Sequence, residues 1–96
     1  MAPLTAAAAA AWTVRLEARR WLAPGTFELA LARPPGFRFT AGQRLRLHAL
    51  GRSRDYSLLG PAPGGPLTLC IRQVAGGPVS AWLAGAPLGQ VLEVEG

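Results

Sequence analysis

Apolar residues recur at every second position over most of this chain. A period of two is typical of half-buried β-strands, because successive side chains of a strand point to opposite faces of the sheet. The pattern predicts six strands, at residues 12–19, 27–31, 44–49, 52–59, 67–72 and 91–95. Turn-forming residues separate the strands, among them Pro24-Gly25 after the first and Gly51 after the third.

One segment has a helical pattern instead. Val79, Trp82 and Leu83 are spaced i, i+3, i+4, which places them on one apolar helix face. Pro78 suits the first turn of a helix, and Gly85 stands where a C-terminal cap is expected. A helix of about two turns is not stable alone, so we expect this one to pack on the sheet.

These elements predict a mainly all-β fold, a six-stranded antiparallel Greek-key barrel with one short helix between strands five and six. A barrel covers its own apolar face and removes most open edges. The chain has 96 residues, of which 50% are hydrophobic, so it forms one small domain and is not intrinsically disordered. We expect this domain at residues 12–96, after a flexible alanine-rich tail at residues 1–11.

The charge of the chain is strongly positive. Ten arginines, no lysine and five acids give a formal net charge of +5. The arginines are dispersed, and only Arg19 and Arg20 are adjacent. Three interpretations remain open: solvated strand faces in an arginine-rich composition, a small phosphate-bearing ligand held by one or two arginines, or a nucleic acid. The last is the weakest, because no basic motif is interleaved with aromatic residues, and we predict no nucleic-acid partner.

Several classes of chemistry are disfavoured by the residues themselves. Cys70 is the single cysteine and His48 the single histidine, so we predict neither a disulfide framework nor a metal site. There is no carboxylate pair, and no serine has an evident His/Asp partner, so redox or group-transfer chemistry would need a cofactor. No apolar run reaches the length of a membrane span, and the start lacks a basic signal region. We therefore expect a cytoplasmic protein.

Two local features predict a binding site for an anion. In the fourth strand, Arg54 and Tyr56 share one face, which pairs a guanidinium with an aromatic ring. Ser57 follows on the opposite face, so the strand must bend, or the ligand must lie along its edge, for all three to touch one ligand. The second feature is residues 76–80, where glycines and Ser80 open the helix and free N–H groups favour a phosphate. Each feature alone could be an ordinary polar strand or an ordinary turn.

Together these segments resemble the ferredoxin–NADP+ reductase superfamily. Residues 54–57 (Arg-Asp-Tyr-Ser) are similar to the Arg-x-Tyr-Ser flavin motif of that family. Residues 69–72 resemble the strand after it, and residues 77–80 the Gly-x-x-Ser that opens the family's helix. Residues 39–43 are similar to its Pro-Gly-Gln segment, with Ala41 in place of proline, and residues 86–96 resemble the stretch that leads out of the barrel. The motifs occur in order across residues 12–96.

The resemblance implies the same barrel fold and a flavin cofactor, FAD, with FMN as the alternative. It implies that Arg54 holds the flavin phosphates, that Tyr56 packs on the isoalloxazine or bonds the ribityl chain, and that Ser57 bonds near flavin N5, where hydride arrives. Backbone groups of Cys70, Ile71 and Arg72 would meet the pyrimidine end of the ring. Gly77, Val79 and Ser80 would hold the pyrophosphate at the helix start.

The resemblance also implies a larger enzyme, in which hydride passes from NAD(P)H to the flavin and electrons continue to an iron–sulfur or haem partner. No glycine fingerprint of an NAD(P)H-binding domain occurs before Gly96. We therefore expect either a piece of a longer protein or an isolated flavin module, which would not turn over alone. The short connection at residues 60–66 leaves adenine recognition, and so FAD against FMN, open. The alternative function is a non-catalytic interaction or regulatory barrel that has lost its cofactor.

Overall fold

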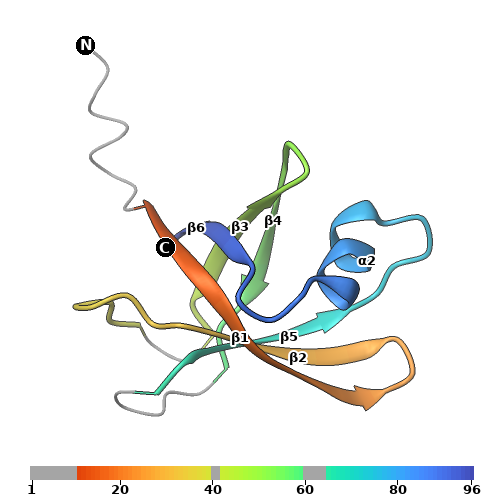
Figure 1. The fold of residues 1–96 in the computed structure, drawn as a ribbon, viewed down its shortest axis with the longest axis horizontal. Helices are drawn as coiled ribbons and strands as arrows, with labels where there is room; N and C mark the ends of the chain where they lie inside the picture. The colour runs from red at the N-terminus through yellow and green to blue at the C-terminus, as the bar shows by residue number, and fades with distance from the viewer. Residues whose placement is uncertain (1–10, 40–41, 60–64) are drawn as a thin grey trace.

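The computed structural model describes residues 11–39, 42–59 and 65–96. Most of the predicted tail, Ala41 and most of the 60–66 connection lie outside these ranges. The elements are β1 (Ala11–Ala23), β2 (Thr26–Leu31), β3 (Arg44–Ala49), β4 (Arg52–Ser57), β5 (Leu67–Arg72), α2 (Pro78–Gly85) and β6 (Val91–Glu95). Six strands, and a helix between the fifth and the sixth, confirm the predicted element order (Figure 1).

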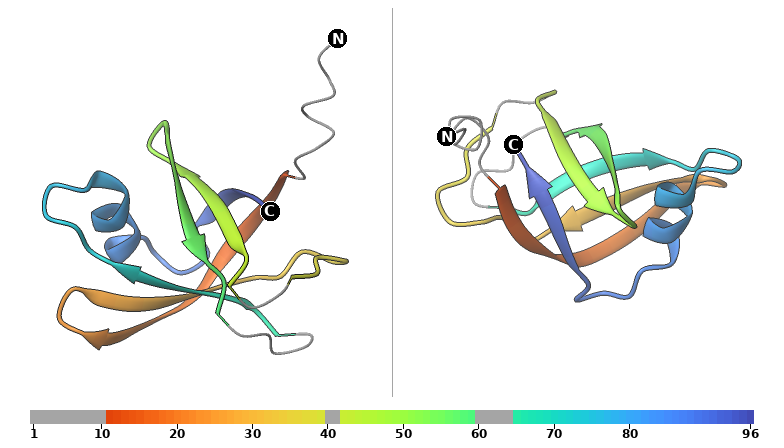
Figure 2. Two further views of the ribbon diagram at one scale, coloured as in Figure 1. Left: turned by 180° about the vertical axis from the view of Figure 1, so that it is seen from behind. Right: turned by 90° about the horizontal axis from the view of Figure 1, so that it is seen from above.

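The strands form one sheet in the order β4-β3-β6-β1-β2-β5, and every neighbouring pair is antiparallel. The two edge strands, β4 and β5, approach each other at one end only. There an isolated antiparallel bridge joins Leu58 to Leu69, and Leu59 N–H donates to the Thr68 carbonyl at 2.9 Å. The sheet is therefore barrel-like, with one gap between β4 and β5, in agreement with the six-stranded antiparallel barrel expected from the sequence. From the bridged end, β4 and β5 run apart (Figures 1 and 2).

The core follows the alternating pattern of the strands. Leu45 and Leu47 of β3 and the predicted inward residues of β6, Leu92 and Val94, are all buried. Further fully buried side chains come from β2 and β5: Phe27, Leu29, Leu31, Leu67, Leu69 and Ile71. Burial of large apolar side chains stabilises the sheet by about 1.5–3 kcal/mol each relative to exposure. The sequence pattern thus correctly identified the inner faces of these four strands.

In β1 the predicted alternation is wrong after Leu16. The strand pairs with β6 through its first half and with β2 from Leu16 onward, and an irregularity in register separates Leu16 from Ala18. Such a β-bulge adds one residue and reverses the faces that follow it. As a result Ala18, predicted inward, is exposed, whereas Arg19, predicted on the polar face, lies opposite the buried Leu29. The strand also continues to Ala23, beyond its predicted end.

Helix α2 packs with one side against the sheet, as expected for two turns. Val79 and Leu83 are buried, whereas Trp82 is only partly buried. Gly85 is the last helical residue, and the C-cap is Ala86, in extended conformation, so the predicted glycine cap is wrong. Arg19 replaces it, because its Nη2 donates to the carbonyls of Leu83 (2.8 Å) and Ala86. A cation at this end also interacts favourably with the helix dipole.

Figure 2 shows α2 at the end of the molecule where β4 and β5 are far apart. Within the described ranges, no helix has the length and apolar character needed to cross a membrane.

Candidate functional site

The inner face of β4 carries polar side chains where its neighbour carries apolar ones. In the register with β3, Arg54 lies opposite Leu47 and Tyr56 opposite Leu45. Residues directly opposite each other share a face, and both leucines are fully buried, so Arg54 and Tyr56 lie on the inner face of the sheet. Yet Arg54 is exposed and Tyr56 only half-buried. This strand therefore borders a hollow and does not close the core.

That hollow is a cavity of about 240 Å³ between β4, the end of β5 and the start of α2. The residues that line it are Arg54, Asp55, Tyr56, Arg72, Val74, Gly77, Val79 and Ser80. The structure thus brings together the two features that the sequence placed about twenty residues apart, the Arg-Asp-Tyr segment and the opening of the helix. Asp55 and Val74 were given no role by sequence reasoning; Val74 follows β5 in a loop, where no periodicity reveals which side a residue faces.

The backbone edges of β4 and β5 border the same gap. Leu59 N–H donates to the Thr68 carbonyl across it, and backbone groups of alternate residues in a strand point to the same side. The backbone groups of Asp55 and Ser57 therefore face β5, and those of Cys70 and Arg72 face β4. Beyond the Leu58–Leu69 bridge, strand edges that run apart in this way offer N–H and C=O groups to a planar polar ligand.

The other predicted residues of these strands lie elsewhere. Ser57 lies opposite the exposed Arg44 on the outer face, so its side chain points away from that of Tyr56, as alternation predicts. The Ile71 side chain is fully buried in the core, and the Cys70 thiol is exposed. Among the described residues, none of these three lines the cavity.

The start of α2 is held by a compact set of contacts. Gly77 N–H donates to the Val74 carbonyl at 2.8 Å, and Val74 N–H donates to Ser80 Oγ at 3.2 Å. The Ser80 hydroxyl lies 3.4 Å from the Gly77 carbonyl, to which it donates. A Cβ at residue 77 would lie 3.1 Å from the Val74 carbonyl oxygen, a tight contact that favours glycine there. Ser80, only 6% exposed, therefore both shapes the loop and forms part of the cavity wall.

No side-chain cap occupies the N-terminus of α2 among the described residues. Pro78 has no N–H, so the first N–H groups of the helix belong to Val79 and Ser80. First-turn N–H groups have no partner within a helix and favour an anion. Because Val79 and Ser80 also line the cavity, this end of the helix can meet a negatively charged group bound there.

The charges around the cavity are mainly positive. Arg46 binds the Asp55 carboxylate from the outer face with two hydrogen bonds, Nε to Oδ1 at 2.9 Å and Nη2 to Oδ2 at 3.3 Å. This bonding lowers the pKa of Asp55 and keeps it ionised. Asp55 is thus already paired, and Arg54, whose Nη1 donates to the Ser53 carbonyl, keeps its charge available to a ligand.

Tyr56 is the aromatic residue of the cavity. Burial raises the pKa of its phenol, and the charge of Arg54 lowers it by a smaller amount. The phenol is therefore neutral near pH 7 and can donate a hydrogen bond. Its ring offers an apolar surface on which a planar ligand could pack.

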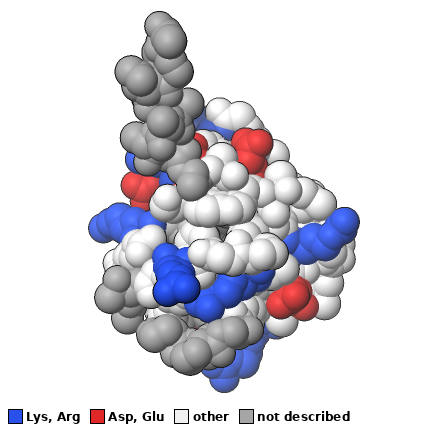
Figure 3. Space-filling model, turned by 90° about the vertical axis from the view of Figure 1, so that its left-hand side faces the viewer, with Lys and Arg blue, Asp and Glu red and all other residues white. Residues whose placement is uncertain are grey.

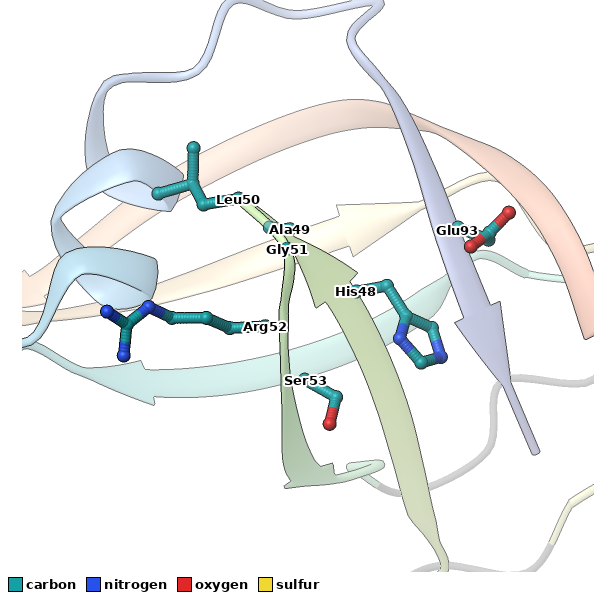
Figure 4. A pocket seen from close by; sticks show the side chains of 7 residues that line it. All are labelled: His48, Ala49, Leu50, Gly51, Arg52, Ser53 and Glu93. Atoms are coloured by element: carbon teal, nitrogen blue, oxygen red, sulfur yellow. The ribbon is translucent and has the colours of Figure 1, made fainter.

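A larger hollow of about 500 Å³ surrounds the β3–β4 turn, but its side chains do not converge. Figure 4 shows Arg52 and Leu50 on one side of the hairpin and His48 and Glu93 on the other. His48 lies on the polar face of β3, as predicted, where its Nε2 bonds Glu95 Oε2. Within the described residues, no group of three or more His, Cys, Asp or Glu could hold a metal ion.

Arginine side chains occupy several places on the face that Figure 3 shows, with acidic side chains near some of them. Several arginines have structural contacts within the chain: Arg19 caps α2, Arg20 pairs with Glu28 at 3.3 Å, and Arg33 lies 5.0 Å from the ring centroid of Phe39. The net charge therefore reflects many separate arginines.

Comparisons with known proteins give matches among solved structures. No protein-family model matches the chain, and a search of curated proteins gives no match. Solved structures do match. They include a cytochrome P450 reductase from Amycolatopsis (29% identity, TM-score 0.80, 92% of this chain and 28% of that one) and the ferredoxin reductase in carbazole 1,9a-dioxygenase (25%, 0.83, 92% and 28%).

A third is a ferredoxin NADP+ reductase from Neisseria gonorrhoeae with bound FAD and NADP (25% identity, TM-score 0.79, 88% of this chain and 36% of that one). The structural neighbours are thus ferredoxin–NADP+ reductase-type proteins, which confirms the resemblance seen in the sequence. The chain spans only about a third of the length of these proteins or less.

Proposed function

We propose that this chain is the flavin-binding domain of an NAD(P)H-dependent oxidoreductase, and that its cofactor is FAD. The observation that carries the proposal is the convergence of Arg54, Tyr56 and the start of α2 on one cavity. A guanidinium, an aromatic ring and uncapped helix N–H groups are complementary to a ligand that has both phosphates and a planar ring.

The residues present fit such a cofactor. Val79 and Tyr56 supply apolar surface, and the one carboxylate at the cavity, that of Asp55, is already bound by Arg46. A cavity of about 240 Å³ is smaller than FAD, so the cofactor would extend along the gap between β4 and β5. There the backbone groups of Cys70 and Arg72 would meet the polar edge of its ring, as the sequence resemblance implies.

Each residue would then have a defined task. Arg54 and the N–H groups of Val79 and Ser80 would hold the phosphates, with Gly77 allowing close approach. Tyr56 would orient the ring and exclude water from one side of it. Ser57 would contact the reacting edge of the ring. Its side chain lies on the outer face of the sheet, so the contact would come from its backbone at the strand edge, which faces the gap. When bound, the flavin supplies the hydride and electron transfer chemistry.

The proposal also extends to the activity of the whole protein. The matching structures are reductases, one of a cytochrome P450 and one of a dioxygenase system. We propose that here, too, hydride comes from NAD(P)H and electrons continue to an iron–sulfur or haem partner, with the NAD(P)H bound by a further domain. Residues 12–96 alone are not expected to turn over. Cytoplasmic location stays a prediction.

Flavin binding tests the proposal directly. FAD and FMN fluorescence is titrated with the purified protein, with Arg54→Ala, and with Arg44→Ala as a control on the outer face of the same hairpin. We expect wild-type protein and Arg44→Ala to bind FAD, and Arg54→Ala to lose most of the affinity. If neither flavin binds folded wild-type protein at high micromolar concentration, the proposal is wrong and the alternative, a barrel that has lost its cofactor, is favoured.

A further inference from the structure

Arg52 is the arginine of β4 that neither the motif nor the cavity explains. It lies opposite Ala49 in the β3–β4 register, and Ala49 is buried, so Arg52 lies on the inner face together with Arg54 and Tyr56. Figure 4 shows its side chain extending from β4 toward the side on which α2 lies, away from His48 and Glu93. Three consecutive inner-face positions of this strand are therefore Arg, Arg and Tyr.

An exposed arginine on the inner face of a sheet needs an explanation. In the described part of the chain, Arg52 has no hydrogen bond or ion pair, whereas Arg46 on the outer face binds Asp55 through two bonds. The hollow at the turn contains one acid, Glu93, but Glu93 points away from Arg52. The guanidinium of Arg52 is thus free to bind an anion from outside the protein.

The spacing of the two arginines suits an anion with two adjacent phosphates. Residues two apart on one strand face are separated by about 7 Å, and flexible arginine side chains can bring their guanidinium groups closer than that. Two adjacent phosphates can therefore be held by both residues, whereas a single phosphate needs only one of them. Arg54 lines the cavity, and Arg52 lies on its far side from Tyr56, where the cofactor would leave the cavity.

We propose that Arg52 is a second phosphate-binding arginine, which holds the adenosine-side phosphate and makes this site select a dinucleotide flavin over FMN. This inference rests on the proposed function and adds to it the residue that determines which flavin binds. Arg54 binds the phosphate nearer the flavin ring, which is present in both FAD and FMN. Arg52 binds the second phosphate, on the adenosine side, which is present only in FAD.

Dissociation constants for FAD and FMN test the inference in four proteins: wild type, Arg52→Ala, Arg54→Ala and Arg44→Ala. We expect Arg52→Ala to weaken FAD about tenfold, as for loss of a hydrogen bond to a charged group, and to change FMN affinity less than about twofold. Arg54→Ala should weaken both flavins, and Arg44→Ala neither. ADP, which has the two phosphates without the flavin ring, should displace FAD from wild type more strongly than from Arg52→Ala.

Three results would contradict the inference or its basis. Unchanged FAD affinity in Arg52→Ala, or an equal loss for FAD and FMN, would overturn the role of Arg52 while leaving flavin binding intact. Absence of binding of either flavin to wild type would overturn the proposed function, and the inference with it. Since Arg52 is exposed, we expect Arg52→Ala to fold, and its melting temperature is measured beside the titrations. Arg52→Gln, which keeps a polar side chain with two N–H donors but is shorter and uncharged, provides a second variant.

Discussion

At the scale of single residues, the bonding partners of each arginine show whether it has a structural role or is available to a ligand. Arg19, Arg20 and Arg46 each bond a carbonyl or a carboxylate of this chain. Arg54 bonds only the neighbouring Ser53 carbonyl among the described residues, and it lies beside Tyr56 at the cavity. Identical side chains thus differ in availability, and this difference, invisible in the composition, indicates where a ligand's negative charge belongs.

The pKa of Tyr56 is sensitive to the charge of Arg54. Tyr56 is the single tyrosine of the chain, so absorbance near the phenolate band follows one group. Because burial raises its pKa and Arg54 lowers it, we expect a pKa above the ordinary value of about 10 in wild type and a higher one in Arg54→Ala. The folded state should lose stability as pH rises through this pKa, since the buried phenol must then ionise. A lower pKa in Arg54→Ala would contradict the assignment.

Ser80 shows how one hydroxyl shapes the helix start. It accepts a hydrogen bond from Val74 N–H and donates one to the Gly77 carbonyl, in a position that is 6% exposed. Ser80→Ala leaves Val74 N–H without its partner, so we expect a loss of about 1–2 kcal/mol in the free energy of unfolding and weaker FAD binding. Urea unfolding measures the first. Ser53→Ala, at an exposed position, is the control and should stay within about 0.5 kcal/mol of wild type.

At the scale of elements, α2 depends on a strand that lies far from it in the sequence. The bulge after Leu16 turns Arg19 inward, and Arg19 then bonds two carbonyls at the end of the helix. The other end of α2 forms a wall of the cavity. The position of the site therefore depends on β1, although no residue of β1 lines the cavity among those described.

The contrast between Arg19 and its neighbour tests this dependence. Arg19→Ala removes two hydrogen bonds to partly buried carbonyls and a favourable charge at the helix end, so we expect a loss of about 2 kcal/mol in the free energy of unfolding and reduced FAD affinity. Arg20→Ala removes only the exposed pair with Glu28 and should cost less than about 1 kcal/mol. Equal effects of the two substitutions in urea unfolding would show that the cap does not hold α2.

The alternating pattern predicted the strands and the faces of β2, β3, β5 and β6, because a period of two directly encodes burial. It did not predict the bulge in β1, because nothing in the sequence around Glu17 distinguishes an extra residue from a regular one. It also placed Gly85 as the helix cap, a role that a distant arginine takes instead. Arg54, Tyr56 and the helix start could be predicted because they form local motifs, whereas Asp55 and Val74 join the site only through tertiary packing.

At the scale of the whole molecule, the gap between β4 and β5 is both a weakness and the place for the ligand. A domain of 96 residues buries only about two-thirds of its unfolded surface. Within the described ranges, the edges of β4 and β5 are joined at the Leu58–Leu69 bridge and nowhere else. A ligand that lies in this gap would connect β4, β5 and α2. Its binding should therefore stabilise the whole domain.

Thermal unfolding with three flavins tests this coupling between binding and stability. At a ligand concentration 100 times the dissociation constant, binding stabilises the folded state by about 2.7 kcal/mol, which for a domain of this size corresponds to a rise on the order of 10 °C in melting temperature. At one fixed concentration we expect the rise to be largest for FAD, smaller for FMN and smallest for riboflavin, which has no phosphate. Arg54→Ala should reduce the difference between FMN and riboflavin, because Arg54, together with the start of α2, holds the phosphate that FMN has and riboflavin lacks. Equal rises for all three flavins in wild type would mean that the ring alone is bound, and that neither Arg54 nor the start of α2 meets a phosphate.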